Sequence, residues 1–294
     1  MKLILKKDSW SNATAFFLKD LYRKHFELSY DLDDEGIVYA HWQDWEWAKS
    51  LNRPAIIDHL WDPWTNPEIK DTEYLKVIRS DGWFCIANEC LWYQALGYNQ
   101  YQAKNINDRT FLMLMNYQRL HRDLIWDKIQ PHLDNALYSY QDRRITINGD
   151  IAREEGPWQR YLNESWYDRT AFSLVVESDI EQGVHSEKVL KPMAFRQPFI
   201  VWGPQGYLKW LRSWGFETFY AVDESYDDEP DNEKRLEMVI REVKRLIKLG
   251  PNHFDDAKTQ QALDTNYKRF YNIEWATKKF EKYFDEIKQY SSRW

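Results

Sequence analysis

The sequence predicts an α/β protein of two domains, each built on a parallel β-sheet with helices on both faces. Short runs of continuous apolar residues alternate along the chain with segments of helix-forming composition, a pattern typical of strands buried on both faces. The length of 294 residues suits two domains of ordinary size better than one. With 43% hydrophobic and 30% charged residues, the composition is that of a globular protein that buries a core.

The first part of the chain contains three apolar runs that predict strands. They are Gly36–Ala40, Pro54–Asp58 and Trp83–Ala87, each rich in β-branched or aromatic residues. Helix-like composition is found between them, over Asn12–His25 and Asp71–Ile78. We therefore expect a first Rossmann-like domain over residues 1–104.

A second series of strands and helices begins near Asn105. Strands are expected at Thr110–Met115, Ala136–Tyr140, Phe172–Glu177 and Pro198–Trp202. Helices are expected at Leu120–Ile129, Ser186–Phe195, Gln205–Ser213 and Asp231–Leu249, and the polar segment Gln141–Arg169 between them is expected as a loop. Residues 105–250 are thus predicted to form a second Rossmann-like domain. Residues 251–294 are predicted to form a tail of amphipathic helices that packs back over the domains.

The bulk composition excludes several classes of function. A net charge of −7, from 40 basic and 47 acidic residues, argues against a sequence-independent nucleic-acid binder. No apolar run reaches the length of a transmembrane helix, and the first residues turn polar too early for a secretory signal. Cys85 and Cys90 match no metal-binding spacing, which favours free thiols and a cytoplasmic location. The 16 Trp and 19 Tyr residues favour a carbohydrate ligand, because flat rings line sugar-binding clefts.

The most informative stretch runs from the strand Phe172–Glu177 into the helix that begins at Ser186. In open α/β sheets ligands bind beyond the carboxyl ends of the strands. Ser186 is a good N-cap, and the free N–H groups of a first helical turn attract phosphate. Lys188 and Lys191 add positive charge, and Glu187 offers an acceptor for a ribose diol. These residues predict a site for a nucleoside diphosphate.

The same stretch resembles the signature of the α1,3-fucosyltransferase family and its viral and bacterial relatives. The matching residues, in chain order, are Phe172, Leu174 and Glu177, then Ser186, Glu187 and Lys188, then Pro198, Val201, Gly203 and Pro204. Ser178 stands where the family has Asn, and His185 stands where it has an apolar residue. The resemblance implies two Rossmann-like domains facing each other across a cleft, the GT-B architecture. It implies a GDP-linked donor such as GDP-fucose, with Glu187 on the ribose and Lys188 on the diphosphate.

The resemblance also implies an arginine on the diphosphate and a carboxylate base. In the family, the first strand-loop-helix of the second domain supplies the arginine; Arg122 is the preferred match and Arg119 the alternative. An inverting transfer needs a base beside the acceptor hydroxyl. Glu89 follows the expected strand Trp83–Ala87, in a position comparable to the family's Glu, and Asp58 at the end of the strand before it is the second candidate.

The sequence predicts neither a metal nor a cofactor. The acidic run Asp223–Glu233 lies in a polar loop before a helix, where acids are favoured by the helix dipole, and lacks the context of a metal-binding Asp-x-Asp. The main prediction is a metal-independent, inverting glycosyltransferase that moves a sugar from a nucleotide-sugar to a carbohydrate or glycoconjugate acceptor. Two alternatives stay open: a non-catalytic sugar- or nucleotide-binding protein on the same fold, and an unrelated α/β assembly factor.

Overall fold

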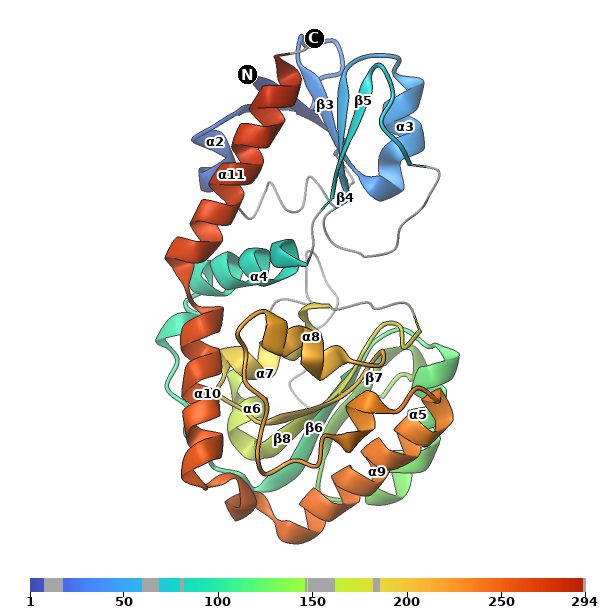
Figure 1. Ribbon diagram of the computed structural model, residues 1–294, viewed down its shortest axis with the longest axis vertical. Helices are drawn as coiled ribbons and strands as arrows, with labels where there is room; N and C mark the ends of the chain where they lie inside the picture. Colours follow the sequence, from blue (N-terminus) through green and yellow to red (C-terminus); the bar gives the residue numbers. More distant parts are fainter. Residues whose placement is uncertain are drawn as a thin grey trace. The chain divides into compact units, whose positions relative to one another are not determined.

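The computed structural model describes residues 1–7, 18–59, 69–79, 82–145, 147, 162–181 and 186–292 (Figure 1). Contacts between Cα atoms divide the chain into two compact units. Unit 1 contains Met1–Trp92 and Ile273–Trp294, and unit 2 contains Tyr93–Asn272. The division falls between Trp92 and Tyr93, whereas the sequence places a boundary near residue 104, and the last helix of the expected tail is grouped with unit 1.

Unit 1 contains a five-stranded sheet in the order β2-β1-β3-β4-β5, and all of its strands are parallel. The strands are β1 Lys2–Leu5, β2 Glu27–Ser29, β3 Ile37–His41, β4 Ala55–His59 and β5 Leu75–Arg79. Among the described residues, its α-helices are α2 Lys19–Arg23, α3 Trp45–Ser50, α4 Trp83–Ala95, which begins in unit 1, and α11 Ile273–Ser291. The strands expected at Gly36–Ala40 and Pro54–Asp58 are confirmed as β3 and β4.

Two expectations for unit 1 are wrong, and they are wrong in opposite directions. Trp83–Ala87 is the start of helix α4, whose residues from Phe84 to Cys90 are all buried. A helix buried on every side carries a continuous apolar run, which local periodicity does not distinguish from a buried strand. The expected helix Asp71–Ile78 is instead strand β5, because Leu75 and Val77 pair in register with β4 and share its apolar face. The expected helix Asn12–His25 appears as α2, and residues 8–17 lie outside the described part.

The sheet of unit 1 is covered on both faces. Val38, Ala40, Ala55 and Ile57 belong to one buried cluster with Ala48 of α3. On the other face, the Tyr39 hydroxyl lies 2.8 Å from the Tyr283 hydroxyl of α11. Helix α11 also packs Phe280 and Phe284 against Tyr22 and Phe26 at ring-centroid distances of 4.8 to 6.4 Å. The C-terminal helix therefore completes the hydrophobic core of the N-terminal sheet.

Unit 2 contains a four-stranded parallel sheet in the order β7-β6-β8-β9. The strands are β6 Arg109–Met115, β7 Leu137–Tyr140, β8 Thr170–Val176 and β9 Phe199–Trp202. The helices are α5 Leu120–Ile129, α6 Glu164–Arg169, α7 Leu190–Ala194, α8 Tyr207–Ser213, α9 Asn232–Leu249 and α10 Ala257–Phe270. All four strands expected here are confirmed.

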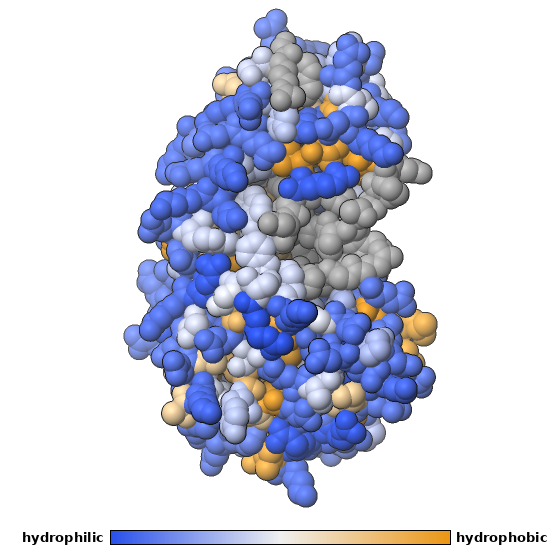
Figure 2. Space-filling view, viewed as in Figure 1, coloured by the Kyte–Doolittle hydropathy of each residue, from blue (hydrophilic) through white to orange (hydrophobic). Residues whose placement is uncertain are grey.

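On the face of the molecule shown in Figure 2, hydrophilic residues predominate, as expected from the high charged fraction.

Two local expectations for unit 2 need correction. The segment expected as the single helix Ser186–Phe195 is a 3₁₀ turn over Glu187–Val189 followed by the short helix α7. Pro192 lies inside this segment, has no N–H to donate, and crowds the carbonyl four residues before it, so a long α-helix is disfavoured. The segment Gln141–Arg169, expected as a loop, contains helix α6 at its end. Residues 148–161 of that segment lie outside the described part.

The order of strands in unit 2 places a topological switch point between β6 and β8. The chain passes from β6 to its neighbour β7 on one side, and from β8 to its neighbour β9 on the other. The loops that follow β6 and β8 therefore run in opposite directions, and ligands of open α/β sheets bind at such a switch point, beyond the carboxyl ends of the strands. The described part of the chain has no helix that is long and apolar enough to span a membrane.

Replacing Phe284 by alanine tests whether α11 is part of the core of unit 1. Phe284 is fully buried, and its ring contacts the rings of Tyr22 and Phe26. We expect a loss of about 3–5 kcal/mol in the free energy of unfolding, the usual cost of emptying a buried aromatic position. Denaturant unfolding followed by near-UV circular dichroism measures it. Lys278→Ala on the exposed side of the same helix is the control, and equal stability of the two variants would contradict this packing.

Candidate functional site

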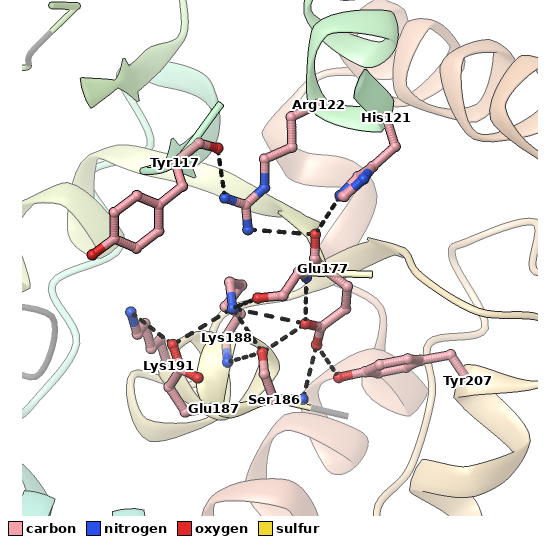
Figure 3. Close-up of polar contacts among 10 residues, drawn as sticks. Tyr117, His121, Arg122, Glu177, Ser186, Glu187, Lys188, Lys191 and Tyr207 are labelled. Carbon is pink, nitrogen blue, oxygen red and sulfur yellow. Dashed lines mark hydrogen bonds and ion pairs between the residues drawn. The ribbon is translucent and has the colours of Figure 1, made fainter. Parts of the chain in front are cut away.

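Glu177 lies at the carboxyl end of β8, at the switch point of the unit 2 sheet, and its side chain is 0% exposed. Its carboxylate accepts four hydrogen bonds: from the Ser178 N–H at 3.1 Å, the Ser186 N–H at 3.2 Å, the Ser186 hydroxyl at 2.6 Å and the Tyr207 hydroxyl at 2.6 Å (Figure 3). A buried carboxylate is costly unless it is compensated in this way. The Glu177 side chain thus connects Ser178, Ser186 and Tyr207 at the carboxyl end of β8.

Lys188 projects over this carboxylate. Its Nζ donates to the hydroxyls of Ser178 at 2.8 Å and Ser186 at 2.9 Å. It also lies 3.8 Å from Glu177 Oε2 and 3.7 Å from Glu187 Oε1. Ser186 caps the following turn by accepting from the Lys188 N–H at 3.4 Å, so the residue before the turn fixes both ends of the lysine. The ammonium group is therefore held at one point above the end of β8.

Two further cations lie around the same strand end. Lys191 forms an ion pair with Glu187 at 3.8 Å. Arg122, from α5 after β6, is 2% exposed and donates to the main-chain oxygens of Tyr117 at 2.9 Å and Glu177 at 3.4 Å. Burial lowers the pKa of Arg122, although a guanidinium stays charged at neutral pH. The Nε of Arg122 is buried with no hydrogen-bond partner among the described residues, so one donor of this cation is unused.

His121 is a contributor that the sequence pattern does not single out. Its Nε2 lies 2.9 Å from the Glu177 carbonyl oxygen, and because a carbonyl only accepts, this nitrogen carries the proton. Its ring packs edge-on against Trp202 of β9. Burial lowers the pKa of His121, so the ring is neutral at pH 7. His121 thus fixes the main chain at the end of β8 without adding charge.

The structure brings six of the predicted site residues into one connected set, drawn in Figure 3. They are Arg122, Glu177, Ser186, Glu187, Lys188 and Lys191. The alternative arginine, Arg119, precedes α5 as its N-cap, and its charge contributes to lowering the pKa of Arg122. His185, a departure from the family pattern, lies outside the described residues. Three cations and two carboxylates meet in this set, which leaves a net positive charge for an anionic ligand.

Asp58, the second candidate base, lies near the carboxyl end of β4 in unit 1 and is 1% exposed. Burial raises its pKa to about 7, a hydrogen bond with Tyr39 opposes that rise, and the charge of Asp44 adds to it. Its Oδ1 has no hydrogen-bond partner among the described residues. Asp58 is thus a carboxyl group that changes its charge near neutral pH, at the edge of a sheet where ligands of α/β folds bind.

Glu89, the first candidate base, has a different setting from the one expected. It does not follow a strand, because Trp83–Ala87 belongs to helix α4, and Glu89 lies in the middle of that helix. Its side chain is 0% exposed, and its Oε1 accepts from the Asn88 amide at 3.3 Å. The argument that placed it beyond the end of a strand is therefore removed.

The acidic run Asp223–Glu233 caps helices. Asp227 accepts from the N–H groups of Leu208 and Lys209 at the start of α8, at 2.9 and 3.2 Å. Asp231 accepts from the N–H groups of Glu233 and Lys234 at the start of α9, at 2.9 and 3.0 Å. These bonds satisfy the free donors of the first turns. Among the described residues, no group of three or more His, Cys, Asp or Glu side chains is placed to hold a metal ion.

The buried carboxyl of Asp58 predicts how stability depends on pH. Its pKa is about 7 in the folded chain and near 3.8 in the unfolded chain, so between these values unfolding releases a proton. Stability from this group is complete below pH 4 and falls, by up to about 4 kcal/mol, as the pH rises to 7. In Asp58→Asn the free energy of unfolding should no longer fall over this range. Urea unfolding at pH 5 and at pH 8 measures the difference. The exposed Asp33→Asn is the control, and an unchanged pH slope in Asp58→Asn would contradict the assignment.

Comparisons with known proteins identify no family. No protein-family model matches the sequence, and no curated protein matches it. Among solved structures, the chain is similar to a crystal structure of an α1,3-fucosyltransferase, with 8% sequence identity and a TM-score of 0.46. The alignment covers 92% of this chain and 90% of that chain. A likeness at this level says nothing about what the chain binds, so function has to be argued from the site residues.

Proposed function

We propose that the protein is a glycosyltransferase that binds a nucleoside diphosphate-sugar at the switch point of unit 2 and transfers the sugar to an acceptor hydroxyl. The observation that carries the proposal is the position of Lys188. Its ammonium group is held by two hydroxyls above a fully compensated carboxylate, with Lys191 and Arg122 around the same strand end. A ligand with adjacent phosphates suits such a cluster, because several donors converge on its oxygens.

These residues would contact different parts of the donor. Lys188 and Lys191 would contact the diphosphate, and Arg122 Nε, which has no partner among the described residues, would donate to it. Glu187, whose side chain is 21% exposed, would accept from the ribose diol. When the sugar leaves, negative charge develops on the diphosphate, and cations fixed in advance stabilise that charge at little reorganisation cost. The resemblance of Phe172–Pro204 to the fucosyltransferase signature supports a GDP-linked donor and inversion.

We propose Asp58 as the base for the acceptor hydroxyl, with Glu89 as the alternative. A general base works best when its pKa lies near the operating pH, and burial brings the pKa of Asp58 to about 7. Asp58 Oδ1 has no hydrogen-bond partner among the described residues, which supports the same role, because a hydroxyl that donates to it would satisfy a buried acceptor. Glu89 lies inside a helix and is bonded to its neighbour Asn88.

One observation favours a second candidate function, a nucleotide- or sugar-binding protein without catalysis. Both candidate bases are almost fully buried, Asp58 at 1% and Glu89 at 0% exposure, and a base has to reach the acceptor oxygen. The cation cluster of unit 2 does not depend on either carboxyl. Binding of the donor and turnover are therefore separate properties of this chain and are tested separately.

Replacing Lys188 by alanine tests the donor site. Calorimetric titration with GDP, UDP, ADP and CMP is expected to show selective binding of one nucleotide to the unchanged protein. We expect Lys188→Ala to weaken that binding by about tenfold or more, because it removes a charge-assisted hydrogen bond. Lys248→Ala, at an exposed lysine in the last turn of α9, is the matched control and should bind normally. A folded protein that binds none of the four nucleotides would favour the assembly-factor alternative.

Replacing Asp58 by asparagine distinguishes an enzyme from a binding protein. Transfer or hydrolysis of the sugar from the selected donor should fall by about 10²–10⁴-fold, the usual contribution of a general base. Binding of the nucleotide should stay unchanged, because the variant keeps every residue of the cation cluster. In the unchanged protein the rate should rise with pH through about 7, as Asp58 loses its proton. Loss of turnover in Glu89→Gln with full turnover in Asp58→Asn would reverse the two roles.

A further inference from the structure

Tyr207 is a buried tyrosine that belongs to none of the matched sequence positions. It begins helix α8 in the fourth position after Gly203, and it is 1% exposed. Its hydroxyl donates to Glu177 Oε1 at 2.6 Å, and this bond joins residues 30 positions apart in the chain. An O–H donor on a carboxylate is among the stronger hydrogen bonds in proteins, especially away from water.

Gly203 leaves the space that this contact requires. A Cβ atom at position 203 would lie 2.9 Å from Tyr207 Cδ2 and 3.3 Å from Glu177 Cγ. Both distances are shorter than ordinary contacts between carbon atoms. The glycine of the Gly-Pro turn is therefore needed for the approach of the Tyr207 ring to the Glu177 side chain, and not for an unusual backbone angle.

From Glu177 the hydrogen bonds continue to the cation. The Ser186 hydroxyl donates to Glu177 Oε2 at 2.6 Å and accepts from Lys188 Nζ at 2.9 Å. The Lys188 ammonium lies 3.8 Å from the same carboxylate oxygen, close enough for attraction but beyond a hydrogen bond. Oε2 already accepts from the Ser178 N–H and the Ser186 hydroxyl, and Oε1 accepts from the Ser186 N–H and the Tyr207 hydroxyl. Each donor removed leaves more negative charge to draw the ammonium inward.

We propose that Tyr207 is a positioning residue for Lys188, acting through Glu177 and Ser186. Its hydroxyl occupies one oxygen of the carboxylate, so that Lys188 stays on the hydroxyls of Ser178 and Ser186, where it meets an anionic ligand. Without that hydroxyl, Lys188 forms a close ion pair with Glu177 and withdraws from the ligand. The inference rests on the proposed function for the effect on nucleotide binding, while the position of Lys188 itself is testable without any ligand.

The ligand-free test measures the reactivity of Lys188 in Tyr207→Phe. Acylation with an amine reagent, quantified per peptide by mass spectrometry, should fall severalfold at Lys188, because a close ion pair protects the ammonium. Lys248 in the same samples is the internal reference. Tyr226→Phe is the matched control, because Tyr226 is also buried in unit 2. Its hydroxyl accepts from the Val201 N–H at 3.4 Å, and this hydrogen bond is not one of those that connect Tyr207 to Lys188. Unchanged acylation at Lys188 in Tyr207→Phe overturns the proposal, whether or not the protein binds a nucleotide.

The binding test uses a double-mutant cycle with the nucleoside diphosphate that the unchanged protein binds best. Tyr207→Phe should weaken binding by about tenfold, the worth of one charge-assisted contact. In the Lys188→Ala background the same replacement should have no further effect, because Tyr207 acts through that lysine. Gly203→Ala, which displaces the same two side chains, should reproduce the loss. Additive losses in the double variant would show that Tyr207 acts independently of Lys188 and would overturn the inference.

A folding defect is distinguished from a positioning effect by the thermal midpoint of each variant. Tyr207→Phe keeps the ring and its packing, so its midpoint should match that of Tyr226→Phe. A nucleotide that fails to bind the unchanged protein would refute the proposed function but leave the acylation result decisive for the position of Lys188. Normal acylation at Lys188 with weakened nucleotide binding would instead place the role of Tyr207 elsewhere in the site.

Discussion

The arrangement of the unit 2 site depends on one buried carboxylate. Glu177 is removed from water at the end of β8, and such a charge is tolerated because it accepts hydrogen bonds from Ser178, Ser186 and Tyr207. Its main-chain oxygen accepts from His121 and Arg122 on α5. One residue therefore joins the strand, the loop after it, the turn that bears Lys188, and the helices α5 and α8. Lys188, through Ser186, and Arg122, through the main-chain oxygen, are both hydrogen-bonded to this residue.

Unit 1 contains a second buried carboxyl group, Asp58, whose hydrogen bonding differs from that of Glu177. Asp58 is as deeply buried as Glu177, yet a single hydrogen bond, from Tyr39, opposes the cost of its charge, and its Oδ1 has no partner in the described part of the chain. Its pKa consequently rises to about 7. The hydrogen bonds to Glu177 instead join the strand to the loop and the helix around it. An uncompensated carboxyl group exchanges a proton near neutral pH, which is the property that a base requires.

The residues proposed to contact a ligand and the residues that support them differ in how they can be found from the sequence. Ser186, Glu187 and Lys188 are adjacent in the chain, and capping rules together with the strand before them indicate their role. Tyr207 and His121 reach Glu177 from 30 and 56 positions away. No local pattern marks them, because a tyrosine at the start of a helix and a histidine near one are ordinary in themselves. Glu89 shows the converse, since its expected role depended on a strand that is a helix.

The sequence by itself determined the alternation of strands and helices in unit 2, the cap of α9, and the cluster of polar residues after β8. Each of these is written in neighbouring residues, as apolar runs bounded by turn and capping residues. Only the tertiary structure decided that Trp83–Ala87 is helical and that Leu75–Arg79 is a strand, because burial on all sides hides helical periodicity and pairing with β4 outweighs local preference. It also decided that α11 completes the core of unit 1, through a contact between Tyr39 and Tyr283 that spans 244 positions. Contacts between residues so far apart depend on the folded chain as a whole, so the pattern of neighbouring residues does not predict them.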